Sequence, residues 1–378
     1  MMLSDLDSAV AALTPFGFDP TVQQRFSASA VAVSDNAVRG ALTPLPDDAL
    51  AKLPALGTPE RERLREAGLA LIRAGRVGVI ILAGGMATRF GGVVKAVVPV
   101  LGDRTFLELR KADVDAVARH AGAAIPTFVM SSFATHDRLL GHIEERALHA
   151  HGPIDVFPQR VALRLTPAGE LFRDRAGTLS PYATGHGDLP DALRGSGFLR
   201  RFREAGGTTL LMSNVDNLGA TVDPALVALH HELGGAITVE TVRKDPGDAG
   251  GAPAVLDGVP QIIEGFRFPK PFDQGTIGVF NTNTLIFDAA TLDRAYELPY
   301  YRVEKKVDGA PVIQFERLVG ELTAFAPSRF VEVPRTGADC RFIAIKEPAD
   351  LDRHRPLIER VARAERGVRA LMPGEWAD

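Results

Sequence analysis

Short apolar runs in the middle of the chain alternate with stretches that repeat apolar and polar residues at helical spacing. Runs of this kind are typical of strands buried on both faces of a sheet. They span Val77–Leu82, Pro126–Ser131, Ile154–Phe157 and Thr208–Met212. The pattern from Phe106 to His120 predicts an amphipathic helix between the first two runs. This rhythm of strands and helices predicts an α/β fold with a mostly parallel sheet and helices on both faces.

The patterns at the two ends of the chain differ from the pattern in the middle. Residues 1–75 are predicted to form a helical N-terminal extension that packs on the core. Residues 76–347 hold all the predicted strands and are expected to form the catalytic core. In residues 348–378 we expect one C-terminal helix, from Pro348 to about Leu371.

The composition limits the possible functions without choosing one. A chain of 378 residues, 46% of them hydrophobic, can bury one large core or two modest ones. The net charge of −4 argues against nucleic acid as a partner, so an anionic substrate would need locally placed cations. The single cysteine, Cys340, excludes a disulfide framework. Without a secretion signal or an apolar run of about 20 residues, we expect a cytoplasmic protein with no membrane partner.

A glycine-rich stretch follows the first predicted strand. Residues 83–92 read AGGMATRFGG, and Lys95 comes shortly after. Glycines let backbone N–H groups turn towards one point, and such a group of donors binds an anion, usually a phosphate. Arg89 and Lys95 add two cations that can reach a polyphosphate. A tight turn with two solvated cations is the alternative, because a glycine-rich loop alone is a weak signal.

Polar residues also follow the third and fourth predicted strands, at the edge where parallel sheets bind ligands. The amide of Gln159 both donates and accepts, so it can read the edge of a base, although spacing alone favours a surface glutamine. Asp216 lies where a carboxylate can hold a divalent metal against a phosphate. An Asx turn formed by Asp216 and Asn217 is the alternative.

His186 lies between two glycines, Gly185 and Gly187. These glycines allow the backbone to approach a flat ligand closely, and they leave the histidine exposed to whatever binds. We therefore favour a functional role for His186 over a packing role. Asp188 is predicted to cap a helix that runs to about Ala205.

Further motifs follow along the chain as far as residue 346. They are SSFATHD at 131–137, TGHGD at 184–188, NVDNLGATVD at 214–223, VFNTNTL at 279–285, VIQFE at 312–316 and RFIAIK at 341–346. With the glycine-rich loop, they resemble the eukaryotic-type UTP–glucose-1-phosphate uridylyltransferase family. In that family the VIQFE-like motif is a helix, and the motifs at 279–285 and 341–346 are strands.

The resemblance implies a fold and a reaction. The fold would be a Rossmann-like nucleotidyltransferase core of the GT-A-like type, with a mostly parallel mixed sheet. The reaction would join UTP and a sugar 1-phosphate, most simply glucose 1-phosphate, to give UDP-sugar and pyrophosphate. Mg²⁺ would be the cofactor.

The resemblance also implies roles for individual residues. Those expected to contact the nucleotide are Leu82, Ala83, Gly84, Gly85, Gln159 and Gly185. Those expected to contact the sugar phosphate are His186, Asn214, Asn217, Glu264 and Asn283. Those expected to act in catalysis are Lys95, Arg89, Asp216, which would also hold the metal, and Lys346, which would reach the phosphates from the opposite side.

The sequence departs from the family pattern at three places. Ala87 replaces a glycine, Val94 replaces the proline before the lysine, and the family's K-G-G lysine is missing at residues 248–251, although Lys244 lies nearby. Loss of these groups would suit a non-catalytic protein that binds nucleotide sugars. The family's C-terminal β-helical domain, which serves oligomerisation, has no counterpart here, so we expect a monomer or weak oligomer.

Two different reactions are also compatible with these motifs. The protein could be a pyrophosphorylase for another sugar, such as N-acetylglucosamine 1-phosphate. It could also be a glycosyltransferase that uses a UDP-sugar, although residues 214–216 contain only half of the D-x-D metal motif expected there.

Overall fold

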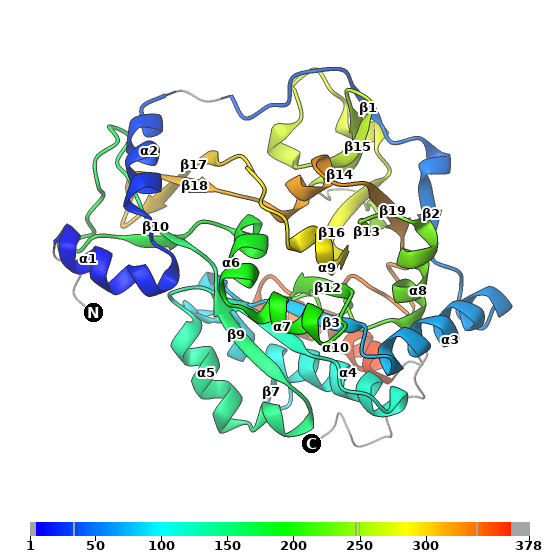
Figure 1. The fold of residues 1–378 in the computed structure, drawn as a ribbon. Coiled ribbons are helices and arrows are strands. Elements are labelled where there is room, and N and C mark those ends of the chain that lie inside the picture. The colour runs from blue at the N-terminus through cyan, green and yellow to red at the C-terminus, as the bar shows by residue number, and fades with distance from the viewer. Residues whose placement is uncertain (1–4, 33–34, 246–247, 249, 338, 364–378) are drawn as a thin grey trace.

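A computed structural model describes residues 5–32, 35–245, 248, 250–337 and 339–363 (Figure 1). The predicted C-terminal helix is α10, which spans Pro348–Arg363, and the rest of that prediction lies outside the described residues. None of the helices in the described ranges is both long enough and apolar enough to cross a membrane.

An eight-stranded sheet forms the centre of the molecule (Figure 1). The strand order is β2-β19-β13-β16-β12-β3-β8-β9, and every strand except β16 runs in the same direction. The strands are β2 (Leu50–Lys52), β3 (Val77–Leu82), β8 (Thr127–Ser131), β9 (Ile154–Pro158), β12 (Thr209–Asn214), β13 (Ile237–Arg243), β16 (Val279–Asp288) and β19 (Ser328–Glu332). The prediction of a mostly parallel mixed sheet is therefore confirmed.

The four apolar runs in the sequence form adjacent strands, β12, β3, β8 and β9. Every residue of β3 is buried, because helices cover both faces of the sheet. Side chains alternate between the faces of a strand. Val79 and Ile81 accordingly belong to the apolar core on one face, and Ile80 and Leu82 belong to the core on the other.

The two cores are completed by different helices. The helices that supply residues to the first core are α3 (Pro59–Arg73), α4 (Phe106–Ala121), α5 (His136–Glu145), α8 (Pro224–Leu233) and α10. Those that supply the second core are α6 (Leu189–Gly195), α7 (Phe198–Glu204) and α9 (Ala289–Leu292). The amphipathic pattern from Phe106 to His120 thus predicted α4 correctly.

The single helix predicted from Asp188 to Ala205 is wrong, because the chain forms α6 and α7 instead. Gly197 separates them with a φ of 76°, a left-handed conformation that ends a helix. The carboxylate of Asp188 does not cap α6. It is buried and accepts hydrogen bonds from Arg317 and Thr184.

The expectation of a helix for the VIQFE motif is also wrong. The motif lies in β18 (Ala310–Glu316), which pairs with β17 (Tyr301–Val307) as a hairpin. Asp308 and Gly309 form the turn, both with positive φ, and an Asp-Gly pair of this kind is a strong hairpin signal. The 341–346 motif is extended but is not part of a strand, although Ala344 makes one bridge to Asn217.

The N-terminal residues are mostly helical, but they are not separate from the sheets. They form α1 (Leu6–Leu13), α2 (Pro20–Ala30) and α3, and β2 is the edge strand of the central sheet. A further strand, β1 (Leu42–Pro44), joins β14 (Ala252–Leu256) and β15 (Val259–Ile263) in a small sheet.

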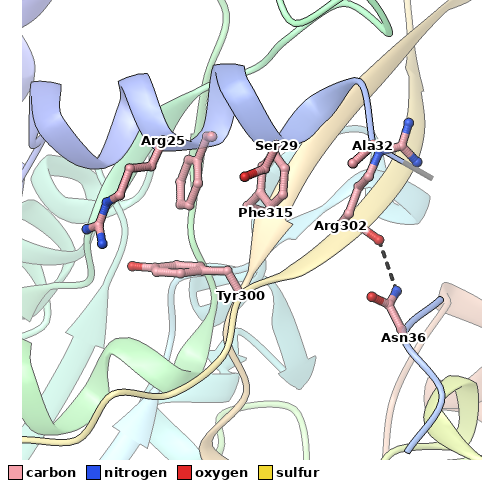
Figure 2. A pocket seen from close by; sticks show the side chains of 8 residues that line it. Arg25, Ser29, Ala32, Asn36, Tyr300, Arg302 and Phe315 are labelled. Atoms are coloured by element: carbon pink, nitrogen blue, oxygen red, sulfur yellow. Dashed lines mark hydrogen bonds between the residues drawn. The ribbon is translucent and has the colours of Figure 1, made fainter. Parts of the chain in front are cut away.

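Helix α2 packs against the β17–β18 hairpin (Figure 2). The rings of Phe26 and Phe315 stack with their centroids 4.6 Å apart, and the ring of Tyr300 meets Phe26 edge-on at 4.7 Å. The hairpin also contacts the segment just after β10 (Val161–Leu163), through a bridge between Leu165 and Ile313. Strand β10 itself pairs with β11 (Pro181–Ala183).

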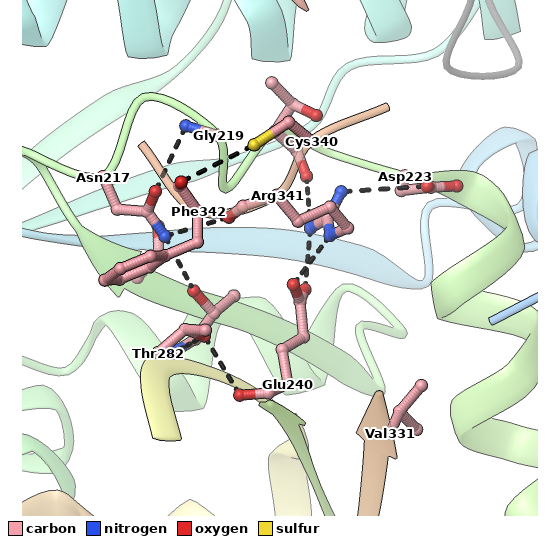
Figure 3. Close-up of polar contacts among 12 residues, drawn as sticks. Asn217, Gly219, Asp223, Glu240, Thr282, Val331, Cys340, Arg341 and Phe342 are labelled. Carbon is pink, nitrogen blue, oxygen red and sulfur yellow. Dashed lines mark hydrogen bonds and ion pairs between the residues drawn. The ribbon is translucent and has the colours of Figure 1, made fainter. Parts of the chain in front are cut away.

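A buried ion pair attaches the 341–346 segment to the centre of the fold (Figure 3). Arg341 donates to Glu240 through Nε at 2.6 Å and Nη2 at 2.7 Å, and the same Nη2 donates to the carbonyl oxygen of Thr221 at 3.0 Å. Both charged side chains are almost completely shielded from solvent. Gly219 permits this close approach, since a Cβ there would lie 2.5 Å from the carbonyl carbon of Arg341.

Removing one member of this pair should be costly. Glu240→Ala leaves the Arg341 charge buried without its main partner, so we expect the free energy of unfolding to fall by about 3–5 kcal/mol. Glu232→Ala is the control, because its ion pair with Arg63 is exposed and should contribute far less to stability. Denaturant unfolding of both variants measures the difference, and equal small losses would contradict a structural role for the buried pair.

Candidate active site

An open cleft of about 320 Å³ lies at the carboxyl ends of β3, β8, β9 and β12. The chain runs outward from β3 to β8 and β9, and then returns to place β12 on the other side of β3. Such a reversal of strand order leaves a crevice between the two strands, and this is where open α/β sheets bind ligands. Most of the predicted site residues line this cleft, namely Leu82, Gly84, Gly85, Lys95, Gln159, Gly185, His186, Asn214 and Asp216.

The glycine-rich loop is a small hairpin that brings Lys95 back to the start of the loop. Strand β4 (Met86–Ala87) pairs with β5 (Val93–Val94), and the N–H of Lys95 donates to the carbonyl oxygen of Gly85 at 3.2 Å. Val94 stands where the family has a proline. Its side chain is buried, and the hairpin forms with valine at this position. The Lys95 ammonium group forms an ion pair with Asp216 across the cleft.

The two glycines after β3 have different surroundings. A Cβ at Gly84 would lie 2.0 Å from Nε2 of Gln159, so only glycine lets that amide lie against the loop. A Cβ at Gly85 would meet nothing within 4 Å, because this residue faces the open cleft. The loop thus holds Gln159 on one side and leaves space for a ligand on the other.

Asp216 lies in a turn that is held from several directions. The N–H of Val215 donates to the carbonyl oxygen of Leu82 at 3.0 Å, which fixes the start of the turn to β3. From α4, the buried Arg110 donates to the carbonyl oxygen of Asn217 and to the hydroxyl of Ser213, both at 2.8 Å. These contacts fix the backbone and leave the carboxylate of Asp216 in the cleft, with its side chain 24% exposed.

The glycines around His186 serve the protein backbone. A Cβ at Gly185, whose φ is 102°, would lie 2.4 Å from the carbonyl oxygen of Arg317, and one at Gly187 would lie 2.5 Å from the nitrogen of Leu318. Both positions require glycine because the backbone packs closely here. The reason expected from the sequence was different, namely the approach of the backbone to a flat ligand. The result is that the 184–188 stretch is pressed against the end of β18.

His186 is held as a neutral hydrogen-bond donor. Its Nδ1 accepts from the N–H of Val319 at 3.0 Å, so the proton of the neutral ring resides on Nε2. Burial lowers the pKa of His186 to about 4. The ring therefore carries no charge at neutral pH, and it can donate to a ligand in the cleft without adding positive charge.

Asn283 lies behind Asn214, at an irregularity in β16. The register between β13 and β16 shifts at Glu240 and Thr241, and Asn283 has a φ of 56°, which is strained for a residue other than glycine. A bulge of this type redirects a side chain. Here Nδ2 of Asn283 donates to Oδ1 of Asn214 at 2.9 Å, so the two amides form a pair beside the cleft.

Lys346 is brought close to Asp216 by the backbone. The N–H of Ile345 donates to the carbonyl oxygen of Asp216 at 3.1 Å, so Lys346 follows directly after the contact. Its side chain is exposed and does not line the cleft. It lies near Asp248: burial raises the pKa of Asp248, but hydrogen bonds, chiefly from Arg335, and the charges of Arg335 and Lys346 outweigh this effect and lower it.

The remaining predicted residues lie outside the lining of the cleft. Ala83 is buried behind it, and Arg89 is exposed to solvent. Asn217 is also buried, and its Oδ1 accepts from the N–H groups of Gly219 and Ile343, so its amide serves the loop in the manner of an Asx turn. The cleft is also lined by four residues that the sequence patterns did not indicate, namely Met130, Ala183, Val215 and Glu316.

Met130, Ala183 and Val215 could have been found, since Met130 is the last residue but one of a predicted strand, and Ala183 and Val215 lie within two residues of the predicted site residues Gly185 and Asn214. The signal for Glu316 was misleading, because its motif resembles one that is a helix in the related family. A strand assignment would have placed its side chain on the face opposite to that of Phe315.

Glu264 lies outside the lining of the cleft, in an unusual electrostatic environment. A Cβ on Gly251 would lie 2.9 Å from its Oε2, so the carboxyl group fits closely against that loop. Burial raises the pKa of Glu264 from its ordinary value of 4.5 to about 7, and the Glu321 carboxylate adds to the effect while Arg267 opposes it. Glu264 therefore changes charge near neutral pH.

This raised pKa predicts a specific dependence of stability on pH. Between about pH 4.5 and 7 the folded state keeps a proton that the unfolded chain has released, so stability decreases as pH rises through this range. The full effect is up to about 3 kcal/mol. Denaturant unfolding at pH 5 and pH 8 should therefore show a larger loss in the native protein than in Glu264→Gln. Equal losses would contradict the assignment.

Comparisons with known proteins show which family the chain is similar to. The profile of the family described as UTP–glucose-1-phosphate uridylyltransferase matches residues 23–355. Among curated proteins, the potato (Solanum tuberosum) UTP–glucose-1-phosphate uridylyltransferase is 29% identical over 297 residues, which are 72% of this chain and 60% of that protein. UTP–glucose-1-phosphate uridylyltransferase 2 of Dictyostelium discoideum is 28% identical over 74% of this chain and 58% of its own length. The chain thus spans about 60% of the length of the curated relatives it matches.

Solved structures with the same fold include two sugar-nucleotide pyrophosphorylases. A putative UDP-N-acetylglucosamine pyrophosphorylase from Entamoeba histolytica superposes with a TM-score of 0.72 at 19% identity, covering 85% of this chain and 87% of the other. A variant of UDP-glucose pyrophosphorylase from Leishmania major gives a TM-score of 0.69 at 24% identity, covering 92% of this chain and 79% of the other. At these identities the likeness establishes the fold, while the profile match covers most of the chain. The chain belongs to the UTP–glucose-1-phosphate uridylyltransferase family.

Proposed function

We propose that the protein is a uridylyltransferase that forms UDP-glucose and pyrophosphate from UTP and glucose 1-phosphate. The observation that carries this proposal is the convergence of three separate segments at the switch point of the sheet. They are the loop with Gly85 and Lys95, the turn with Asp216, and the extended segment that ends at Lys346. A polyphosphate needs donors and cations from several sides, and this arrangement offers them.

The nucleotide is proposed to occupy the part of the cleft over β3, β8 and β9. The amide of Gln159, held against Gly84, suits the edge of a uracil, and the backbone of Gly185 lies in the same lining. The sugar 1-phosphate is proposed to lie towards β12 and β16, where Asn214 and Asn283 are paired. Glu264 packs against Gly251, whose carbonyl oxygen accepts from the N–H of Asn281 in β16 at 2.8 Å. Amides and carboxyl groups suit the hydroxyl groups of a sugar.

The proposed Mg²⁺ fits one residue of the cleft. The described part of the chain holds no cluster of three or more histidine, cysteine or carboxylate residues that could bind a metal. Mg²⁺ is usually held by one or two carboxylates together with substrate phosphates and water. The partly exposed carboxylate of Asp216 would hold it together with the phosphates of UTP. When bound, the metal supplies charge neutralisation at the phosphates.

The chemistry asks the protein mainly to position its substrates. A phosphate oxygen of the sugar 1-phosphate attacks the α-phosphorus of UTP in line. The new P–O bond forms as the bond from the α-phosphorus to its bridging oxygen breaks, and pyrophosphate leaves with the electron pair. Lys95 and Lys346 would stabilise the negative charge that develops on the leaving group. His186 would donate from Nε2 as a neutral group and would keep its protonation state throughout.

The departures from the family pattern do not remove this constellation. Lys95 reaches the cleft despite Val94, and Lys244 donates to the carbonyl oxygen of Gln274 at 3.1 Å. Lys244 is therefore engaged in the loop and is not proposed to replace the missing lysine. The cytoplasmic location and the monomeric or weakly associated state stay predictions from the sequence.

The test of the proposed function is a coupled pyrophosphate assay of the full chain with UTP and Mg²⁺. Glucose 1-phosphate, N-acetylglucosamine 1-phosphate and galactose 1-phosphate are supplied in turn. We expect pyrophosphate release with glucose 1-phosphate to be the fastest. Faster release with N-acetylglucosamine 1-phosphate would favour that sugar, and UTP binding without any release would support a non-catalytic protein.

Lys346 provides a sharper test of the mechanism. Removing a cation that stabilises the leaving group is expected to lower kcat by at least ~100-fold in Lys346→Ala, while the fold stays intact because the side chain is exposed. Lys306→Ala, which removes an exposed lysine from the β17–β18 hairpin, is the control and should keep full activity. Normal turnover in Lys346→Ala would remove this residue from the mechanism.

A further inference from the structure

Glu316 is a carboxylate that lines the cleft without an assigned role. It is the last residue of β18, and only one other acidic residue, Asp216, belongs to the described lining. The charge of Asp216 is balanced by Lys95. The nearest cation to Glu316 is Lys305, which lies 3.9 Å away and is half exposed. Arg164 also attracts it electrostatically, but forms no ion pair with it. A carboxylate without a close cation, in a cleft proposed to bind phosphates, calls for an explanation.

Only one of the two oxygens of Glu316 is engaged by the protein. Nε and Nη2 of Arg164 lie 2.6 and 3.0 Å from one terminal atom of the Gln314 side chain, which identifies that atom as the amide oxygen. The amide nitrogen of Gln314 then donates to Oε1 of Glu316 at 3.2 Å. Lys305 approaches the same Oε1. Among the described residues Oε2 has no partner, so it is available to accept a hydrogen bond from a ligand.

The charge of Glu316 decides which part of a ligand it can meet. A carboxylate repels the phosphates of both substrates, so it must face a part of the ligand that is uncharged and carries donors. Glu316 lies beside residues 184–188, which form one wall of the cleft. The next residue, Arg317, holds it there, because its N–H donates to the carbonyl oxygen of Thr184 at 2.8 Å. That wall carries Gly185, on the nucleotide side of the cleft, whereas Asn214 and Asn283 lie towards β16.

We propose that Oε2 of Glu316 accepts a hydrogen bond from a ribose hydroxyl of the nucleotide, so that this residue selects ribonucleotides over deoxyribonucleotides. The proposal rests on the proposed function and adds a determinant of specificity to it. The uracil edge already has the amide of Gln159 beside Gly84. The ribose hydroxyls are the remaining uncharged donors on the nucleotide, and each can donate to a carboxylate.

The hairpin that carries Glu316 is held rigidly, which a specificity contact requires. Its Phe315 stacks on Phe26 of α2, and Tyr300, which precedes β17, meets the same ring (Figure 2). The guanidinium group of Arg317 lies 4.9 Å from the centre of the Tyr300 ring and donates to the buried Asp188 at 2.8 Å. The residues on both sides of Glu316 are therefore fixed to the rest of the protein.

The test compares the binding of UTP, 2′-deoxy-UTP and 3′-deoxy-UTP to the full chain in Mg²⁺, by isothermal titration calorimetry. The native protein should bind at least one deoxynucleotide about 10-fold more weakly than UTP, because a hydrogen bond to a charged acceptor is lost. Glu316→Ala should bind UTP about 10-fold more weakly and should no longer distinguish it from that deoxynucleotide. Glu304→Ala, which removes a carboxylate from the other strand of the hairpin, is the matched control and should keep the native preference.

Glu316→Gln serves as a second variant if Glu316→Ala does not fold. It preserves the volume of the side chain but replaces the charged acceptor, so the preference for UTP should shrink several-fold. Equal binding of UTP and both deoxynucleotides to the native protein would overturn the inference and leave the proposed function intact. A preserved ribose preference in Glu316→Ala would also overturn it. If the native protein binds no UTP, the proposed function fails, and the inference fails with it.

Discussion

The buried contact between Arg341 and Glu240 is the interaction on which the geometry of the cleft depends. Taking two charges out of water is expensive, and the cost is offset only where the geometry is good and further hydrogen bonds are made. Here the guanidinium group meets both carboxylate oxygens and the carbonyl oxygen of Thr221. The contact joins β13, the loop after β12 and the segment that ends at Lys346. It therefore fixes the loop after β12 and the segment that ends at Lys346 relative to each other, beside the proposed phosphate site.

A second electrostatic feature explains how the cleft can be stable when no substrate is bound. Lys95 and Asp216 neutralise one another across the site, with exposed fractions of only 15% and 24%. The phosphates and the metal ion of the proposed reaction would bring charges of opposite sign to each partner, so that the pair would be exchanged for contacts to the ligand. Lys346 is exposed and lies near Asp248, and in the proposed mechanism its side chain would turn towards the phosphates.

Much of the fold followed from local sequence patterns. The apolar runs predicted β3, β8 and β12 closely, because these strands lie inside the sheet and almost all of their residues are buried. The run that predicted β9 also held, although β9 is an edge strand and four of its five residues are only partly buried. The patterns failed where tertiary contacts decide the local structure. Asp188 has the pattern of a helix cap, but its carboxylate accepts hydrogen bonds from Arg317 instead. The VIQFE motif resembles a helix of the related family, but here it forms a strand of a hairpin, whose turn is made by Asp308 and Gly309.

The candidate site was predictable to a similar extent. Residues at the ends of parallel strands, such as Lys95, Gln159 and Asp216, could be placed together because the carboxyl ends of such strands share one edge of the sheet. No local pattern indicates that Asn283 turns towards Asn214, since this depends on a bulge between β13 and β16. The Asx turn considered for Asn217 is local, since its Oδ1 accepts from the N–H of Gly219, but its further contacts to Arg341 and Ile343 lie more than a hundred residues away and have no local signal.

The most direct measurement of the central claim is a crystal structure of the protein with UDP-glucose and Mg²⁺. We predict the uracil beside Gln159 and Gly185, and the phosphates between the loop of Gly85 and Lys95 on one side and Lys346 on the other. We also predict that Asp216 has exchanged its contact with Lys95 for one to the metal. A ligand bound elsewhere, or phosphates that leave either lysine in solvent, would contradict the claim.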